Sequence, residues 1–390
     1  MSTDRAARSQ GLSHRRRVCF LFIAQPHQVL HSLPIALALA QGWPDIDIEI
    51  AATAQGQLDY VADLIGRLRA DPLPTRLLGP GWLRRYRPGG ASIPPKAPML
   101  AANLALFADY DAIVAPERTT ALLRTLGLKR QKLVYTQHGA GDRGGVFEPR
   151  LRSFDLVMAS GPKLYDRIVG GGLARPENCA IVGYPKFDIV DALPFHPPAL
   201  FADARPVVLY NPHFDPKLSS WPRDGMAVLQ AFAEDPRYNL IFAPHVRLFD
   251  GKNPDRASVE RFAQAPNIHV ALSGEAMIDM TFTRLADVYL GDVSSQVYEF
   301  LRTPRPCAFI NAHAAQWRDN PDYRHWAYGP VTDSAADILA TIDRSRTEHA
   351  DRYLAEQQAG FAETFDLRAD RSSSERAASA IVTTLARDTP

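Results

Sequence analysis

The chain has 390 residues, of which 46% are hydrophobic and 22% are charged. A single core rarely grows beyond roughly 250–300 residues, so this length predicts two domains, and the composition excludes a disordered or membrane-spanning chain. Its 44 Lys and Arg residues balance 43 Asp and Glu residues, for a net charge of +1, whereas a dedicated nucleic-acid-binding protein would carry a basic excess.

The N-terminus, residues 1–17, is expected to be a disordered basic tail. An arginine triplet followed by an apolar run has the outline of a signal peptide. However, His27 and His31 interrupt the run, which never approaches the ~20 residues of a membrane span. We therefore predict a buried strand over 18–24, a helix over 28–41 and a cytoplasmic protein.

Short apolar segments then alternate with helical periodicity. Strands that are apolar throughout indicate a parallel sheet covered on both faces. In this first half we expect strands at 46–53, 112–115, 133–136, 156–159 and 180–182, with helices at 58–68 and 119–126.

Residues 67–99 depart from this pattern, because arginines lie among Trp82, Tyr86 and several Gly and Pro residues. A solvated surface loop explains the composition. The alternative is a basic-aromatic lip that receives an anionic or membrane-borne acceptor, with Arg84 and Arg85 as contacts.

A Pro-rich stretch from 183 to 205 marks the domain boundary. We expect an N-terminal domain over 18–190, a linker over 191–205 and a C-terminal domain over 206–333, followed by helices in 334–390 that pack across both domains. In the second domain the predicted strands are 206–210, 239–243, 268–271, 288–290 and 307–310, and the predicted helices are 223–234, 276–284 and 296–301.

This alternation predicts two doubly wound α/β domains. Three cysteines, Cys19, Cys179 and Cys307, lie far apart in apolar segments without metal-binding spacing. We expect them to be buried, unpaired side chains of a protein in a reducing compartment.

Ligands of such sheets bind at the carboxyl ends of the strands. The predicted strand 133–136 runs into His138, Gly139, Asp142 and Arg143 within a glycine-rich segment. A lone His after a strand is often structural, but the glycines and charges favour a general base with a pKa near neutrality.

Two strands of the second domain end in a His next to Pro. His213 follows Asn211-Pro, and His245 follows Pro and precedes Arg247 by two residues. This repetition predicts an anion-binding crevice. Lys186 either belongs to a simple turn or contacts phosphate there.

A further strand ends at Asp292 and leads into Ser294 and Ser295 at a predicted helix start. Serines at this position serve as N-caps or, alternatively, bind a phosphate at the positive helix end. Glu299, one turn later, could accept ribose hydroxyls.

In this order the segments resemble the CDP-glycerol glycerophosphotransferase family, which builds teichoic acid and related poly(polyol phosphate) chains. The resemblance covers roughly residues 133–311. It rests on His138-Gly139, Gly183-x-Pro185-Lys186-x-Asp188, the strand ending at 211–215, His245, Asp292-x-Ser294-Ser295-x-x-x-Glu299-Phe300 and the strand 307–310.

The resemblance implies a GT-B-like fold, two Rossmann-like domains facing across a cleft, with the donor bound mainly by the second domain. According to this resemblance, His138 takes the proton from the acceptor hydroxyl and His245 contacts the pyrophosphate of the donor. Ser294 and Ser295 then bind the donor phosphates, and Glu299 lies near the ribose. This chain has Ala140 where the family commonly has Thr, and Val293 and Glu299 where it has Tyr and Asp. These changes leave the identity of the polyol open.

The expected function is transfer of a glycerol-phosphate-like group from a CDP-activated donor to a saccharide or polyol-phosphate acceptor, lipid-linked in one version, in cell-envelope or capsule synthesis. We expect no resident cofactor or metal, no nucleic-acid partner, and peripheral attachment to the inner face of the membrane. The alternatives are a GT-B glycosyltransferase with a UDP- or CMP-activated sugar, and a nucleotide-binding module without catalysis.

Overall fold

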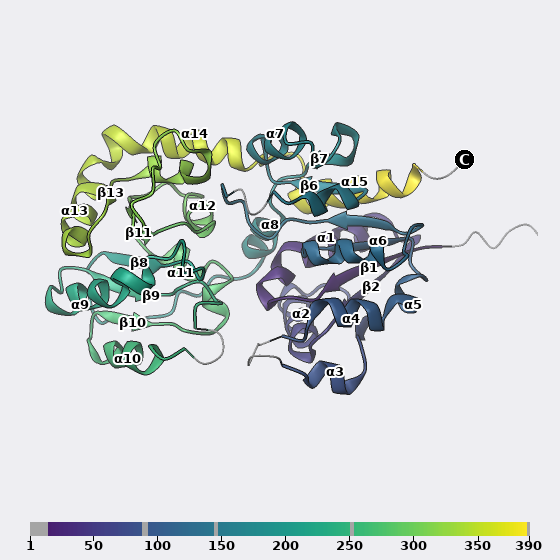
Figure 1. Ribbon diagram of the computed structural model, residues 1–390, viewed down its shortest axis with the longest axis horizontal. Helices are drawn as coiled ribbons and strands as arrows, with labels where there is room; N and C mark the ends of the chain where they lie inside the picture. The colour runs from purple at the N-terminus through teal and green to yellow at the C-terminus, as the bar shows by residue number, and fades with distance from the viewer. Residues whose placement is uncertain (1–14, 88–92, 144–146, 250–252, 388–390) are drawn as a thin grey trace, which may run out of the picture.

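A computed structural model describes residues 15–87, 93–143, 147–249 and 253–387. Within these ranges the strands form two separate parallel sheets, one in each half of the molecule (Figure 1). Residues 1–14 of the predicted tail and Gly144 and Gly145 of the glycine-rich segment lie outside the described residues.

The first sheet is seven-stranded, with the order β3-β2-β1-β4-β5-β6-β7 and parallel pairing throughout. The strand order reverses between β1 and β4, which are neighbours in the sheet. The central strands are almost wholly buried because helices cover both faces. The strands are β1 (Arg16–Phe22), β2 (Ile46–Ala52), β3 (Thr75–Leu77), β4 (Ala112–Ala115), β5 (Lys132–Tyr135), β6 (Leu156–Ala159) and β7 (Cys179–Ile181).

The second sheet is six-stranded and parallel, with the order β10-β9-β8-β11-β12-β13. Its order reverses between β8 and β11, so both sheets have a topological switch point of the kind that binds ligands. The strands are β8 (Val207–Asn211), β9 (Asn239–Phe242), β10 (Ile268–Val270), β11 (Val288–Gly291), β12 (Cys307–Ile310) and β13 (Val331–Thr332).

Helices connect these strands. In the first half they are α1 (Val29–Gly42), α2 (Gln55–Leu68), α3 (Gly81–Arg85), α4 (Lys96–Ala102), α5 (Leu104–Phe107), α6 (Leu122–Thr125), α7 (Pro162–Gly170) and α8 (Pro185–Ala192). After β8 they are α9 (Met226–Glu234), α10 (Arg256–Glu260), α11 (Thr281–Leu285), α12 (Gln296–Phe300), α13 (Ile338–Glu348), α14 (Leu354–Thr364) and α15 (Ser373–Ala386), the last three following the final strand.

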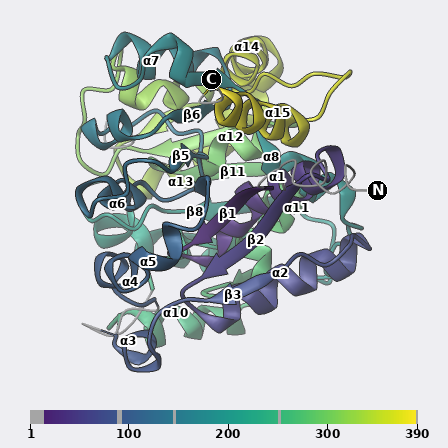
Figure 2. The same ribbon diagram turned by 90° about the vertical axis from the view of Figure 1, so that its right-hand side faces the viewer.

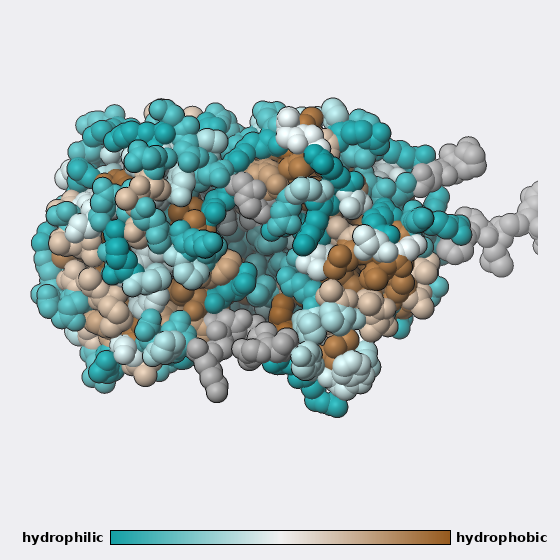
Figure 3. Space-filling model, viewed as in Figure 1, coloured by the Kyte–Doolittle hydropathy of each residue, from teal (hydrophilic) through white to brown (hydrophobic). Residues whose placement is uncertain are grey.

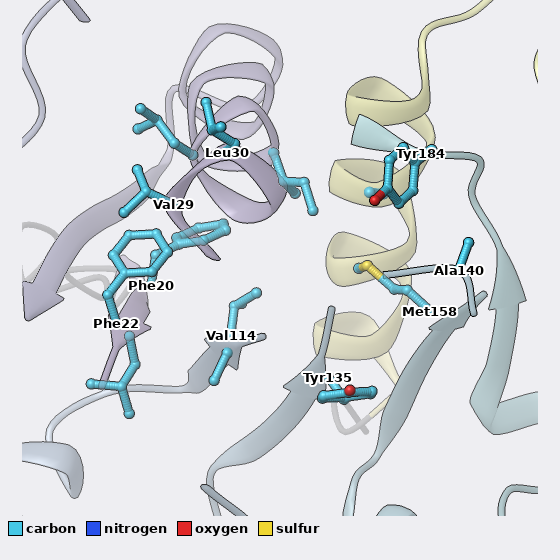
Figure 4. Packing of buried hydrophobic residues seen from close by; sticks show 14 of the residues in the cluster. Phe20, Phe22, Val29, Leu30, Val114, Tyr135, Ala140, Met158 and Tyr184 are labelled. Atoms are coloured by element: carbon cyan, nitrogen blue, oxygen red, sulfur yellow. The ribbon is translucent and has the colours of Figure 1, made fainter. Parts of the chain in front are cut away.

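The core of the first half forms where β1 and α1 meet the later strands. Phe20, Phe22 and Leu30 are fully buried there, with Val114 beside them on β4, and buried Tyr135 and Met158 extend the core along β5 and β6 (Figure 4). All three cysteines are buried and unpaired, as expected.

The chain returns to the first half at its C-terminal end. Helix α15 packs against α1 and α8 (Figure 2), and it buries Ala377, Ala378, Ile381 and Leu385 in the first core. The end of α14, the helix that precedes α15, is also bound to the first half. The hydroxyl of Ser160 donates a hydrogen bond of 2.7 Å to the backbone carbonyl of Thr364, the last residue of α14.

The predicted strands agree with the structure to within two residues, but several segments differ. The predicted helix 276–284 is divided into a 3-10 turn (Glu275–Met277) and α11, because Met280 between them has a left-handed backbone with a φ of 69°. Strand β1 begins at Arg16, inside the predicted tail, because the Arg17 amide bonds the Asp111 carboxylate at 2.8 Å. The predicted loop 67–99 contains β3, α3 and the start of α4, and helix α8 occupies the first part of the Pro-rich stretch 183–205. Pro185 stands in the first turn of α8, where its missing N–H costs nothing.

Candidate functional site

A cavity of about 440 Å³ lies between the two halves, and the surface is recessed and hydrophilic there (Figure 3). Its walls come from the segments that follow β1, β4 and β5 in one sheet and β8, β9 and β11 in the other. These strands flank the two switch points, so the cavity lies where the topology of both sheets predicts a ligand. The predicted residues in its lining are His138, Gly139, Asp142, Arg143, Lys186, His213, His245, Arg247, Ser294, Ser295 and Glu299.

His138 is held in one tautomer. Its Nδ1 lies 2.5 Å from the backbone carbonyl of Pro116, which follows β4. A carbonyl oxygen can only accept, so Nδ1 carries the proton and the neutral ring keeps a lone pair on Nε2. Burial lowers the pKa of His138, against the opposing effect of Glu117. The ring is therefore prepared to accept a proton near neutral pH.

His213 and His245 have the opposite tautomer. Their Nδ1 atoms accept hydrogen bonds from the backbone amides of Asp215, at 3.1 Å, and Arg247, at 3.2 Å. Each neutral ring therefore has its proton on Nε2 and acts there as a donor. The two ring centroids are 5.5 Å apart. Burial lowers the pKa of both, that of His213 to about 4.

Arg143 reaches the same region from the first half. Its charge lowers the pKa of His213 across the cavity, and its buried Nη1 has no hydrogen-bond partner among the described residues. Arg247 stacks over Phe214, 3.9 Å from the ring centroid. Two neutral donors beside these guanidinium groups form a surface that suits a phosphate.

Ser294 and Ser295 precede α12, and the glycine-rich segment packs directly on them. A Cβ at Gly139 would lie 3.1 Å from Ser295 Oγ, and one at Gly141 would lie 3.3 Å from Ser295 Cβ. A larger residue at either position would crowd Ser295, because the two halves approach closely here. This contact brings the segment that carries His138 next to the two serines.

Lys186 and Glu299 form a buried ion pair across the two halves. Lys186 Nζ lies 2.7 and 2.8 Å from the two carboxylate oxygens, and the side chains are 4% and 8% exposed. The hydroxyl of Tyr184 donates to the same carboxylate at 2.8 Å. Both residues line the cavity, but each already has a protein partner, whereas the sequence suggested separate contacts with phosphate and ribose.

Asp142 is the centre of a second cross-domain network. Its carboxylate accepts hydrogen bonds from Lys163 at 2.8 Å, from the Tyr298 hydroxyl at 2.6 and 2.7 Å, and from His325 Nδ1 at 2.9 Å. These partners hold the pKa of Asp142 well below its usual range although the group is buried. His325 Nε2 lies 3.0 Å from the backbone carbonyl oxygen of Asp292, which also accepts a hydrogen bond from the Trp326 indole at 2.6 Å. Asp142 therefore positions the loop that carries His138.

Asn211 and Asp292 do not line the cavity, contrary to expectation. The Asn211 amide donates to the Ala243 carbonyl at 2.6 Å, and the Asp292 carboxylate accepts from the backbone amides of His213, at 2.9 Å, and Ser220, at 2.6 Å. Both side chains are buried and satisfied by the protein. They fix the strand ends that carry His213 and His245.

Arg84 and Arg85 also lie away from the cavity. They belong to α3, which follows the edge strand β3, and Arg84 donates hydrogen bonds to the carbonyls of Leu78 at 3.3 Å and Gly79 at 2.5 Å. Trp82, in the same helix, is 67% exposed. The two arginines predicted as acceptor contacts therefore do not contribute to this site.

Sequence reasoning missed the segment that follows β1. His27, Gln28 and His31 line the cavity, as do Lys96 and Glu117, which form an ion pair of 2.6 Å. The two histidines were seen only as interruptions of an apolar run. Their position could have identified them, because they directly follow the strand predicted over 18–24. In a doubly wound sheet the first strand lies at the switch point, where ligands bind.

A second cavity, of about 500 Å³, adjoins the first and shares Gln25, His27, Val246 and Ile278 with it. Its walls are mostly apolar. Tyr60 contributes from α2, and the other half contributes Phe249, Leu272, Met277 and Ile278. The two halves therefore enclose one polar and one apolar chamber, side by side.

The described residues contain no group of three or more His, Cys, Asp or Glu side chains placed to hold a metal ion. None of their helices is both long and apolar enough to cross a bilayer.

Comparison with family models and with curated sequences gives no match. Among solved structures, the chain is similar to a putative UDP-N-acetylglucosamine 2-epimerase from Listeria monocytogenes, with a TM-score of 0.60 and 14% identity over 96% of this chain and 98% of that one. It is also similar to a variant of the wall teichoic acid polymerase TagF soaked with CDPG, with a TM-score of 0.61 and 13% identity over 96% and 88%.

A third neighbour is the UDP-GlcNAc 2-epimerase from Neisseria meningitidis bound to UDP-GlcNAc, with a TM-score of 0.55 and 14% identity over 95% of this chain and 100% of that one. Likeness at these identities concerns the fold. Together with the two parallel sheets, it confirms the predicted two-domain α/β architecture of the GT-B type.

Proposed function

We propose that this protein is a transferase that moves a polyol phosphate, such as glycerol phosphate, from a CDP-activated donor to a hydroxyl of a saccharide or polyol-phosphate acceptor. The observation that carries the proposal is the pair of opposite tautomers around one cavity. His138 offers a lone pair on Nε2, whereas His213 and His245 offer N–H donors.

In the proposed reaction, the acceptor hydroxyl loses its proton to His138 Nε2 as its oxygen attacks the phosphorus that bears the polyol. The bond from that phosphorus to the bridging oxygen breaks, and CMP leaves with the electron pair. His213, His245 and Arg143 stabilise the negative charge on the phosphates by hydrogen bonding, and the cavity supplies the alignment.

The paired chambers support a nucleotide as the leaving group. A nucleotide has a charged phosphate part and a flat base whose ring faces suit apolar surroundings, and the polar cavity adjoins an apolar one of about 500 Å³. Among the structural neighbours, one was soaked with CDPG and another holds UDP-GlcNAc. In this proposal the enzyme works at the inner face of the membrane, on lipid-linked acceptors.

A thermal-shift panel of CMP, CDP-glycerol, UDP, UDP-GlcNAc and CMP-sialic acid tests the donor. A ligand at about 100 times its Kd adds about 2.7 kcal/mol of stability. We expect selective stabilisation by CMP and CDP-glycerol. Selective stabilisation by UDP compounds would instead indicate a sugar transferase or epimerase, the second candidate, which the UDP-binding neighbours favour.

Turnover tests the base. His138→Gln should lower kcat more than ~10²-fold while leaving CMP binding unchanged. His196→Gln, at an exposed position outside both cavities, is the matched control and should behave as the wild type. Near-normal turnover of the His138 variant would exclude the assigned role.

A further inference from the structure

Three polar atoms at the start of α1 are buried without a partner. His27 Nδ1, Gln28 Oε1 and His31 Nδ1 have no hydrogen bond among the described residues. Gln28 and His31 are each 2% exposed, and all three side chains line the polar cavity. Buried polar groups in folded proteins are almost always paired, so three orphans facing one cavity indicate a ligand that pairs with them.

The surroundings define the charge of that ligand. Burial lowers the pKa of His27 to about 3 and that of His31 well below its usual value, so both rings are neutral. Of the cations that act on His27, Lys186 is paired with Glu299 and Lys96 with Glu117, and Arg247 lies over the ring of Phe214 in the other half. Gln28 Oε1 is an acceptor and would repel a phosphate oxygen. Neutral imidazoles and an amide oxygen instead match hydroxyl groups, which both donate and accept.

The position of the three residues relates them to the proposed base. The ring centroids of His27 and His138 are 6.0 Å apart. Ser32, one turn further along α1, shares a buried hydrogen bond of 2.6 Å with Thr136, which follows β5. This bond fixes the start of α1 relative to the segment that carries His138.

We propose that His27, Gln28 and His31 form a subsite for an uncharged, polyhydroxylated group, the polyol or sugar ring that presents the attacking hydroxyl to His138. The phosphates then lie on the opposite side of the cavity, at His213, His245 and Arg143. This inference rests on the proposed function, since it identifies the acceptor's part of the same site.

A structural role is the competing explanation, because His31 packs edge-on against Tyr184 with ring centroids 5.2 Å apart. Stability separates the two roles. If the polar atoms serve the fold, Gln28→Leu should lower the melting temperature. If they serve a ligand, replacing an unsatisfied buried amide with an apolar group of similar size should leave the melting temperature unchanged or raise it.

The decisive experiment measures binding of neutral and anionic probes separately. Saturation-transfer NMR with glycerol and with N-acetylglucosamine reports the hydroxylated group, and the two probes distinguish a polyol from a sugar ring. Broadening of the ³¹P signal of inorganic phosphate reports the anion site. The variants are Gln28→Leu and His31→Leu, with Gln41→Leu as the control, because Gln41 lies on the same helix but is exposed.

We expect at least a fivefold loss of the saturation signal in the Gln28 and His31 variants, no loss in the Gln41 variant, and unchanged phosphate broadening in all three. An unchanged saturation signal in the Gln28 and His31 variants would overturn the inference. So would loss of phosphate broadening in those variants, since it would place the anion here. A wild-type protein that binds neither CMP nor CDP-glycerol but keeps the Gln28-dependent signal would refute the proposed donor and retain the subsite.

Discussion

Replacing Lys186 with Met should destabilise the protein far more than loss of an ordinary ion pair. The Lys186 and Glu299 side chains are 4% and 8% exposed and meet at 2.7 and 2.8 Å. Among the described residues, Lys186→Met leaves the buried Glu299 carboxylate with the Tyr184 hydroxyl as its one remaining side-chain partner. Breaking such a buried pair costs about 3–5 kcal/mol, because the remaining charge is uncompensated.

The double variant Lys186→Met/Glu299→Leu should recover most of this loss, since apolar groups of similar size replace buried ion pairs at little cost. Urea denaturation of the wild type, both single variants and the double variant completes the cycle. Arg256→Met is the control. It breaks an exposed pair, 42% and 54% exposed, with Glu260, and should cost no more than about 0.5 kcal/mol.

Two results would refute this reasoning. One is a Lys186→Met variant within about 0.5 kcal/mol of the wild type, a difference typical of an exposed pair. The other is a double variant no more stable than either single variant. If Lys186→Met instead loses CMP binding without losing stability, Lys186 is mainly an anion ligand, as its place in the sequence suggested.

Burial lowers the pKa of His138, so the acid limb of kcat/KM should lie below pH 6.5; a limb above pH 7 would contradict its role as base. His27 has a pKa of about 3 when folded and about 6.5 when unfolded. The unfolded chain therefore binds one more proton between these values, and stability falls as pH falls through 6.5. Going from pH 7.5 to 5 should cost about 2 kcal/mol through this group. In urea denaturation at both pH values, the His27→Gln variant should lose about 2 kcal/mol less stability than the wild type between pH 7.5 and 5. An equal loss in the two proteins would show that His27 does not have a lowered pKa in the folded state. A Cβ at Gly161 would lie 2.6 Å from the Thr364 carbonyl oxygen, so Gly161→Ala should cost about 1–3 kcal/mol. Gly170→Ala, with open space around its Cβ and a place in helix α7, should be neutral or stabilising, and equal melting temperatures for the two variants would contradict this account.

The strands and much of the cavity lining could be predicted from the sequence. Apolar segments bounded by turn residues identify parallel strands, and the carboxyl ends of those strands converge in this fold. This reasoning brought His138, His245 and Ser295 to one place although they lie far apart in the chain. Their positions depend on the order and direction of the strands, and the pattern of hydrophobic residues along the chain indicates both.

Pairing between side chains could not be predicted in the same way. Lys186 and Glu299 are 113 positions apart, and nothing in either segment shows that the two charges meet. Asp142 was predicted as a charged residue of the glycine-rich segment, while its partners Tyr298 and His325 lie in the other half. Whether a polar residue faces a ligand or another residue depends on how the domains dock, which local sequence does not encode.

The return of the chain to its first half has a consequence for synthesis on the ribosome. Helix α15 supplies Ile381 and Leu385 to the core built by β1 and α1, whereas the second sheet is complete once β13 has been made. The half that is translated first is thus the last to finish its core. Until α15 emerges, the side of α1 that packs against it stays uncovered, although α8 already covers another side. A nascent chain stalled before residue 373 should therefore be a substrate for chaperones.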